Sequence, residues 1–131
     1  MATIYKESLI DAPLTKAWAA LSDFGAVHEK LVPGFVTDCR MDGAARVVTF
    51  FNGATARELL VGIDDTANRV AYSATGGRAA HHNASAQVFD AGENRTRFVW
   101  ITDVLPNDVA GYIDAMMEQG LAVIKKTLER G

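Results

Sequence analysis

The sequence contains a single cysteine, Cys39, and only three prolines among its 131 residues. One cysteine excludes an internal disulfide, which fits a protein that folds in a reducing compartment. We expect Cys39 to be a buried strand thiol rather than a nucleophile. No apolar run approaches the roughly 18 residues of a membrane span, and residues 1–6 lack the apolar core of a signal peptide. These absences predict a cytoplasmic protein without a membrane span.

Charge of either sign is modest. Thirteen basic and sixteen acidic side chains give a net charge of −3, and no basic run or patch of interleaved basic and aromatic residues occurs. Nucleic acid is therefore not an expected partner. Hydrophobic residues make up 49% and charged residues 22% of the chain, the balance of an ordinary globular protein. At this length we expect a single domain spanning residues 1–131.

Motifs of common cofactor and metal sites are also absent. The sequence has no Gly-rich phosphate loop, no Gly-x-Ser-x-Gly elbow and no His-Glu-x-x-His helix. His81 and His82 are adjacent, and in a strand they point to opposite faces, so they do not jointly ligate one metal. We therefore expect no metal and no cofactor.

β-like segments dominate the chain after its first thirty residues. Short turn signals such as Asp42-Gly43 and Asn52-Gly53 separate them, and such turns join antiparallel neighbours. With the first strand, the expected strands are Thr3–Ile10, Phe35–Met41, Ala45–Phe51, Ala56–Asp64, Arg69–Thr75, His81–Asp90 and Arg95–Leu105.

Two short helices are expected after the first strand. Asp11 is a candidate N-cap and Pro13 fits the first turn of a helix that continues to Leu21. A second helix over residues 26–31 ends before Pro33. The order is therefore β-α-α-β6-α, an α+β fold in which a seven-stranded antiparallel curved sheet wraps around a long C-terminal helix.

That final helix is expected from Pro106 to Arg130, capped by Asn107 or Asp108, with apolar residues at a 3.6-residue period. Tyr112, Met116 and Gly120 form one line along it. A glycine within a helix costs about 1 kcal/mol relative to alanine, so its presence calls for a reason. Gly120 either borders a pocket or lets the helix approach the sheet closely, and the sequence leaves both readings open.

The order of these elements and several short motifs resemble the START/Bet v 1-like (SRPBCC) superfamily, in particular its bacterial polyketide cyclase/dehydrase branch. The resemblance covers nearly the whole chain and includes Ile10-Asp11-Ala12-Pro13, Leu21-Ser22-Asp23-Phe24, Val32-Pro33-Gly34-Phe35, Arg57-Glu58, Ile63-Asp64-Asp65, Arg69-Val70-Ala71-Tyr72 and Trp100 before Pro106. It implies a helix-grip fold with an internal cavity between the sheet and the C-terminal helix.

A more distant similarity to the plant abscisic-acid receptors suggests functional positions. Residues 52–55 lie where those receptors carry a gate loop, and residues 77–80 where they carry a latch. Glu58 lies where they place a cavity carboxylate that reaches the ligand through water. The Pro of that gate and the His-Arg of that latch are missing here, so hormone-type signalling is not implied.

Strand alternation assigns other side chains to the cavity. In residues 81–90 the small apolar face carries Ala84 and Ala86, and it brings His82 with it. Periodicity alone favours Leu59, Val61 and Ile63 inside on the strand over residues 56–64, whereas the resemblance favours Glu58. We follow the resemblance, and an inward Glu58 then needs a partner such as Arg46, because an isolated buried charge is prohibitively costly.

The resulting candidate site combines tentative catalytic residues with a larger ligand-binding set. The catalytic candidates are Glu58, His82 and Arg46; the ligand-binding candidates are Arg46, Val48, Phe50, Glu58, Leu60, Tyr72, His82, Ala84, Ala86, Trp100, Tyr112, Met116 and Gly120. Trp100 is expected to be a cavity wall, although both faces of its strand are apolar.

Three functions remain open from the sequence. The first is binding of a hydrophobic, partly oxygenated or aromatic small molecule in the cavity. The second is a cofactor-independent enzyme for cyclisation, dehydration or another proton transfer, in which Glu58 or His82 moves a proton. The third is a lipid-binding or protein-interaction module. A homodimer is compatible with the sequence but not required by it.

Overall fold

A computed structural model describes residues 2–130. Its strands are β1 (Ala2–Ile10), β2 (Val36–Asp42), β3 (Ala45–Phe50), β4 (Thr55–Asp64), β5 (Arg69–Thr75), β6 (His81–Gly92) and β7 (Arg95–Leu105). Its helices are α1 (Leu14–Ser22), α2 (Val27–Lys30) and α3 (Ala110–Leu128), and the short 3₁₀ turns η1 (Phe24–Ala26) and η2 (Asn107–Val109) precede α2 and α3. The order is the predicted β-α-α-β6-α.

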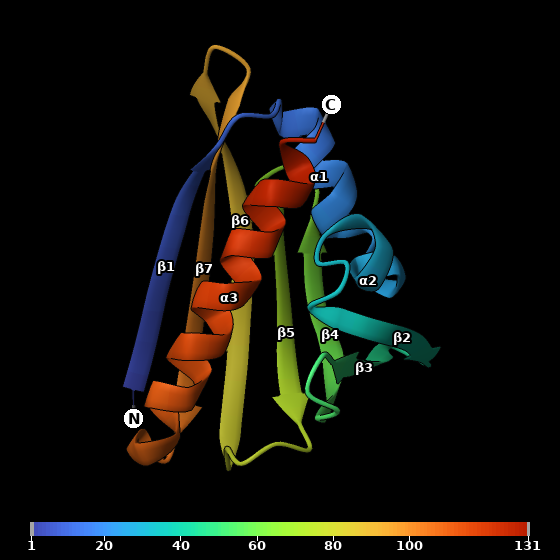
Figure 1. Ribbon diagram of the computed structural model, residues 1–131, viewed down its shortest axis with the longest axis vertical. Coiled ribbons are helices and arrows are strands. Elements are labelled where there is room, and N and C mark those ends of the chain that lie inside the picture. Colours follow the sequence, from blue (N-terminus) through green and yellow to red (C-terminus); the bar gives the residue numbers. More distant parts are fainter. Residues whose placement is uncertain (1, 131) are drawn as a thin grey trace.

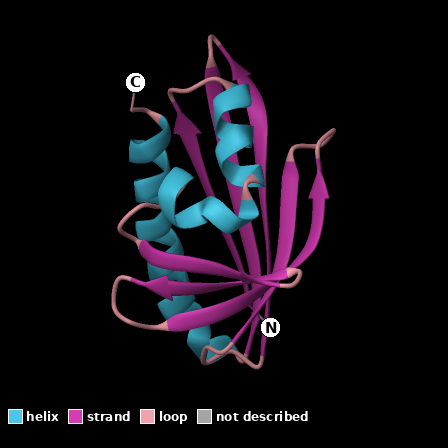
Figure 2. Cartoon of the chain, turned by 90° about the vertical axis from the view of Figure 1, so that its right-hand side faces the viewer, coloured by secondary structure: helices cyan, strands magenta, loops and turns pink. Residues whose placement is uncertain are grey.

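All seven strands form one antiparallel sheet in the order β1-β7-β6-β5-β4-β3-β2. Consecutive strands from β2 to β7 are neighbours because short turns join them, and β1 closes against the last strand, β7. Figure 1 shows α3 lying over the sheet beside β1, with β2 and β3 running crosswise to β5. Figure 2 shows the same strands bending around the helical layer. The helix-grip fold is confirmed.

The buried face of α3 packs against the concave face of the sheet. Its buried residues recur every three or four positions, as expected for an amphipathic helix, and are Met117, Gly120, Leu121, Ile124 and Leu128. Most of them join the main core with α1 and the central strands, while Met117 joins a smaller cluster with Ile4, Val104 and Val109. No helix within residues 2–130 is long and apolar enough to cross a membrane.

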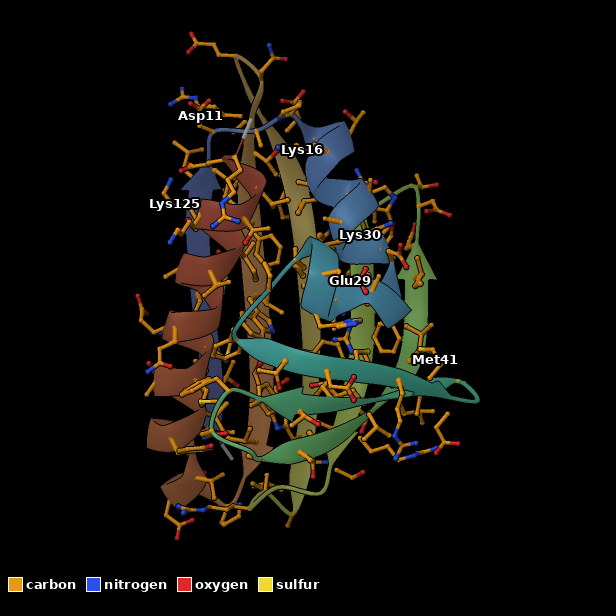
Figure 3. The ribbon with its side chains drawn as sticks, turned by 45° about the vertical axis from the view of Figure 1, so that its right-hand side comes forward. Asp11, Lys16, Glu29, Lys30, Met41 and Lys125 are labelled. Atoms are coloured by element: carbon orange, nitrogen blue, oxygen red, sulfur yellow. The ribbon has the colours of Figure 1, made fainter. Side chains whose placement is uncertain are left out.

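Polar contacts fasten both ends of α3 to β1. Lys6 of β1 pairs with Asp114 at 2.8 Å and with Glu118 at 2.7 Å. At the other end Lys125 donates to the Leu9 carbonyl at 2.8 Å, and Figure 3 shows Lys125 on the same side of the molecule as Asp11. These contacts hold α3 over the concave face of the sheet. They therefore fix the position of the helix relative to any cavity between helix and sheet.

The predicted helix caps are wrong. The Asp11 side chain does not cap α1; Pro13 is its N-cap residue, and the Pro13 carbonyl accepts from Lys16 and Ala17. Asn107 and Asp108 lie inside η2, after Pro106, and cap neither η2 nor α3 with a side chain. The cause is the extended backbone at Pro106, from which the chain enters α3 through one 3₁₀ turn. The helix therefore begins at Ala110 rather than at Pro106.

Candidate ligand-binding site

Two adjoining chambers lie between the sheet and the helices. The outer chamber has a volume of about 140 Å³ and lies under the first half of α3. The inner chamber has a volume of about 60 Å³ and extends toward α1, α2 and Ile124. Five side chains line both chambers and so stand at their boundary: Phe35, Phe50, Glu58, Tyr72 and Trp100. The helix-grip fold thus encloses a divided space.

A buried ion pair lies at this boundary. Arg46 of β3 and Glu58 of β4 are cross-strand partners, and each residue is 8% exposed. The Arg46 Nε donates to Glu58 Oε1 at 2.7 Å, and Arg46 Nη1 donates to the Phe24 carbonyl at 3.1 Å. The pair satisfies the requirement that a buried charge has a charged, hydrogen-bonded partner. It places a carboxylate on the wall of both chambers.

Aromatic rings complete the surroundings of Arg46. The guanidinium carbon lies 3.9 Å from the Phe24 ring centroid and 5.2 Å from that of Tyr72. Cation–π contacts of this kind favour a charged guanidinium that has lost part of its hydration. Arg46 is therefore held in place from several directions, and Glu58 is the member of the pair that lines both chambers.

The side chains of Tyr72 and Trp100 are in contact at the boundary between the two chambers. The Trp100 Nε1–H donates to Tyr72 Oη at 3.2 Å. Burial raises the pKa of Tyr72 far above its ordinary value of 10, so the phenol stays protonated at neutral pH. Its own O–H therefore remains able to donate a hydrogen bond.

His82 contributes to the outer chamber from β6. It is partly buried, and desolvation lowers its pKa below the ordinary 6.5, with Glu58 opposing and His81 adding to the shift. The imidazole is therefore mainly neutral at pH 7 and can act as donor and acceptor. His81 is exposed on the opposite face and contacts Asn83 Oδ1 at 2.6 Å, as strand alternation requires.

Exposed residues of two loops mark the mouth of the outer chamber. Residues 54–55 and 77–79, within the two loops compared above with a gate and a latch, all contribute to the lining. The Arg78 guanidinium lies 5.4 Å from the ring centroid of Tyr112, which is 40% exposed at the start of α3. Arg78 and Tyr112 thus flank the opening, with the positive charge facing solvent.

Gly120 does not border either chamber. A Cβ at this position would lie 3.2 Å from both Phe35 Cε2 and Trp100 Cζ3. The missing side chain therefore makes room for two aromatic rings rather than for a ligand. Of the line along α3, only Tyr112 and Met116 reach the outer chamber.

The other predicted ligand-binding residues divide into two groups. Val48 and Ala86 line the inner chamber, whereas Phe50 and Trp100 line both. Leu60 and Ala84 line neither chamber, since Ala84 is buried in the main core and Leu60 packs at its edge. Sequence alternation places a residue on the concave side, but it does not determine whether a neighbour covers it.

The periodicity of β4 points to the wrong face. Leu59 is 42% exposed and Val61 67%, while Glu58 is buried. The pairing of β4 with β5 shifts between Leu60 and Gly62, so a bulge at Val61 breaks the alternation of the strand. A count of alternating apolar residues misses such a shift.

Sequence reasoning also missed Thr102. This β7 residue is 1% exposed and lines the outer chamber, and its Oγ1 has no hydrogen-bond partner within the described part of the chain. The available signal was its spacing of two from Trp100, which places both on the concave face.

Cys39 is only partly buried on β2, contrary to the expected buried thiol. Desolvation still raises its pKa, which lowers its thiolate fraction at neutral pH and makes it a poor nucleophile. Among residues 2–130, no three His, Cys, Asp or Glu side chains gather as a metal site.

Chemically, the site offers apolar walls with a few ionisable groups. Glu58 can accept a proton or hydrogen bond, neutral His82 can do either, and Tyr72 can donate. Arg46 is the hydrogen-bonded partner of the Glu58 carboxylate. This is the composition of a pocket that orients a largely apolar molecule through a small number of polar contacts.

Comparison with known proteins identifies the lineage. Residues 1–129 match the model of the family described as polyketide cyclase/dehydrase and lipid transport. The chain belongs to this family. Membership places it in the START/Bet v 1-like superfamily, as the sequence motifs indicated. Comparison with curated proteins gave no significant match.

Several solved structures share the fold at low identity. An uncharacterized protein from Bacillus thuringiensis is 15% identical over 98% of this chain and 100% of its own, with a TM-score of 0.88. A START superfamily protein from Mycobacterium smegmatis is 13% identical, with 97% and 94% coverage and a TM-score of 0.71. Norcoclaurine synthase from Thalictrum flavum is 18% identical, with 98% and 84% coverage and a TM-score of 0.74. At these identities the likeness concerns the fold.

Proposed function

We infer that this family member binds a hydrophobic, partly oxygenated or aromatic small molecule in the outer chamber. The observation that carries this conclusion is the buried Arg46–Glu58 pair facing an apolar cavity. A buried pair with no ligand to contact is often no better than apolar residues of similar volume, so stability alone gives little reason for it. A ligand hydroxyl that donates a hydrogen bond to the Glu58 carboxylate supplies such a reason.

The cavity walls set the character of the ligand. Trp100 and Met116 present apolar surface to the outer chamber, and burial of that surface is the main source of affinity. Glu58, Tyr72 and His82 then orient the molecule. Norcoclaurine synthase from Thalictrum flavum, which shares the fold, has been solved in complex with dopamine and hydroxybenzaldehyde. Both are small oxygenated aromatic compounds, in agreement with the ligand class proposed for this chain.

Blocking the outer chamber tests the proposal. Ala74 of β5 lines it, whereas Ala71 lies on the opposite face of the same strand. We expect 5-indanol, an apolar bicyclic phenol, to bind the wild-type protein with one-to-one stoichiometry in isothermal titration calorimetry. Ala74→Phe abolishes this binding and Ala71→Phe does not, with both variants shown to be folded by circular dichroism. Equal binding by both variants excludes the outer chamber.

A second candidate function is enzymatic. The Glu58 carboxylate reaches both chambers and His82 stays mainly neutral, so each can accept a proton from a bound substrate. This arrangement supports a cofactor-independent cyclisation or dehydration. With a substrate in hand, Glu58→Gln eliminates turnover and leaves ligand affinity within about tenfold of wild type. Unchanged turnover removes Glu58 from the mechanism.

A further inference from the structure

Thr102 is a buried polar residue whose hydroxyl has no hydrogen-bond partner in residues 2–130. It lies on the concave face of β7, two residues after Trp100, and lines the outer chamber. The residue is 1% exposed, and no hydrogen-bond partner of its Oγ1 exists among the described residues. Native structures rarely leave a buried hydroxyl unpaired, so each case requires a specific explanation.

A second threonine of the same strand shows that the fold satisfies buried hydroxyls elsewhere. Thr96 is fully buried, and its Oγ1 donates to the Ala12 carbonyl at 2.7 Å. Valine has nearly the shape of threonine and needs no partner, so packing alone does not call for a hydroxyl at position 102. The hydroxyl of Thr102 therefore calls for an acceptor from outside residues 2–130.

Thr102 and Glu58 lie on different walls of the outer chamber. Glu58 belongs to β4 and Thr102 to β7, with β5 and β6 between them in the sheet. Three strand spacings correspond to about 14 Å across the sheet, part of which the two side chains and their hydrogen bonds take up. The two polar groups can therefore contact opposite ends of one small molecule, while apolar walls contact its middle.

We propose that Thr102 is a second hydrogen-bonding point for the ligand, and that the ligand is a compact ring compound with oxygen at both ends. One oxygen is a hydroxyl beside Glu58, and the other is an acceptor such as a ketone beside Thr102. This inference rests on the proposed function. The size agrees, because an engineered cavity of about 150 Å³ holds benzene and the outer chamber has about 140 Å³.

Three matched probes test the proposal: indane without oxygen, 5-indanol with one hydroxyl, and 5-hydroxy-1-indanone with a hydroxyl and a ketone at opposite ends. Titration calorimetry measures each against the wild-type protein and Thr102→Val. We expect the ketone to increase affinity for the wild type roughly tenfold over 5-indanol, and Thr102→Val to remove this gain. The affinity of 5-indanol itself stays the same in the variant.

Thermal unfolding without ligand provides the control for folding. Thr102→Val keeps or raises the melting temperature because it removes an unpaired hydroxyl, whereas Thr96→Val lowers it by removing a hydrogen bond. A lower melting temperature for Thr102→Val shows that its hydroxyl has an internal role and overturns the proposal.

The outcomes separate this inference from the proposed function. If none of the three probes binds, the small-molecule function itself fails. If indane and 5-indanol bind but the ketone adds no affinity, or adds the same affinity in Thr102→Val, the function stands and the role of Thr102 is excluded.

Discussion

Arg46 of β3 and Glu58 of β4 face each other at the boundary between the two chambers. The Arg46 Nε lies 2.7 Å from Glu58 Oε1, and each residue is 8% exposed. This relationship joins fold and function in one contact. The strand register brings the two side chains together, and their mutual charge makes burial tolerable. The same register turns the carboxylate toward the space that we assign to the ligand.

The first prediction concerns the cost of breaking this pair. Glu58→Gln leaves Arg46 buried without a negative partner, and we expect the free energy of unfolding to fall by about 3 kcal/mol in urea titrations. The double variant Arg46→Met/Glu58→Leu buries no charge. Its free energy of unfolding is therefore expected to fall less than that of Arg46→Met alone or of Glu58→Leu alone. Equal or additive losses contradict the interpretation that the pair is a mutually dependent buried unit.

The second prediction concerns pH. Since burial lowers the pKa of His82 in the folded state, the unfolded chain takes up a proton near pH 6.5 that the folded protein binds less readily. His82 therefore makes the free energy of unfolding fall as the pH falls below 6.5. His82→Gln is expected to reduce this loss between pH 6.5 and about pH 5 in denaturant titrations.

The matched control for His82 is His81, which is exposed on the opposite face of β6. His81→Gln is expected to keep most of the wild-type pH dependence over the same range, because burial is the largest cause of the lowered His82 pKa and His81 a lesser one. If His82→Gln leaves the pH dependence of the free energy of unfolding unchanged, the folded state does not disfavour the protonated imidazole of His82.

The third prediction tests the reason for Gly120. A methyl group there meets the Phe35 and Trp100 rings at 3.2 Å, so Gly120→Ala forces the rings to move despite the better helix propensity of alanine. We expect a net destabilisation of about 1 kcal/mol, together with a change in Trp100 fluorescence measured in a Trp18→Phe background.

Gly111 of the same helix is the control, because a Cβ there meets nothing within 4 Å. Gly111→Ala is expected to raise stability by up to about 1 kcal/mol. A stabilising Gly120→Ala refutes the close-packing explanation.

The fourth prediction concerns the hydroxyl that links β7 to the chain before α1. Thr96 Oγ1 donates to the Ala12 carbonyl at a fully buried position. Thr96→Val leaves that carbonyl without its partner, and we expect a loss of about 2 kcal/mol in the free energy of unfolding. Thr96→Ser keeps the hydroxyl donor and is expected to recover part of this loss. If packing alone caused the loss, serine, which lacks the methyl group, would not recover it.

Much of the architecture follows from local pattern. Turn signals such as Asp42-Gly43 separate β-like runs that must pair with their neighbours, and the observed bounds of β5 and β7 equal the predicted ones. The placement of Arg46 beside the inner chamber and of His82 and Tyr112 beside the outer chamber also follows from alternation and helix spacing, with the family resemblance needed for Glu58. The role of these residues in ligand binding remains a prediction.

The sequence by itself therefore determined the order of elements and the antiparallel pairing from β2 to β7, because these depend on contacts between near neighbours in the chain. Only the tertiary structure decided the bulge at Val61, the filling of the space at Gly120 and the unpaired hydroxyl of Thr102. These features depend on contacts between distant segments, where one ring or one shifted residue determines whether a position faces a neighbour or a cavity.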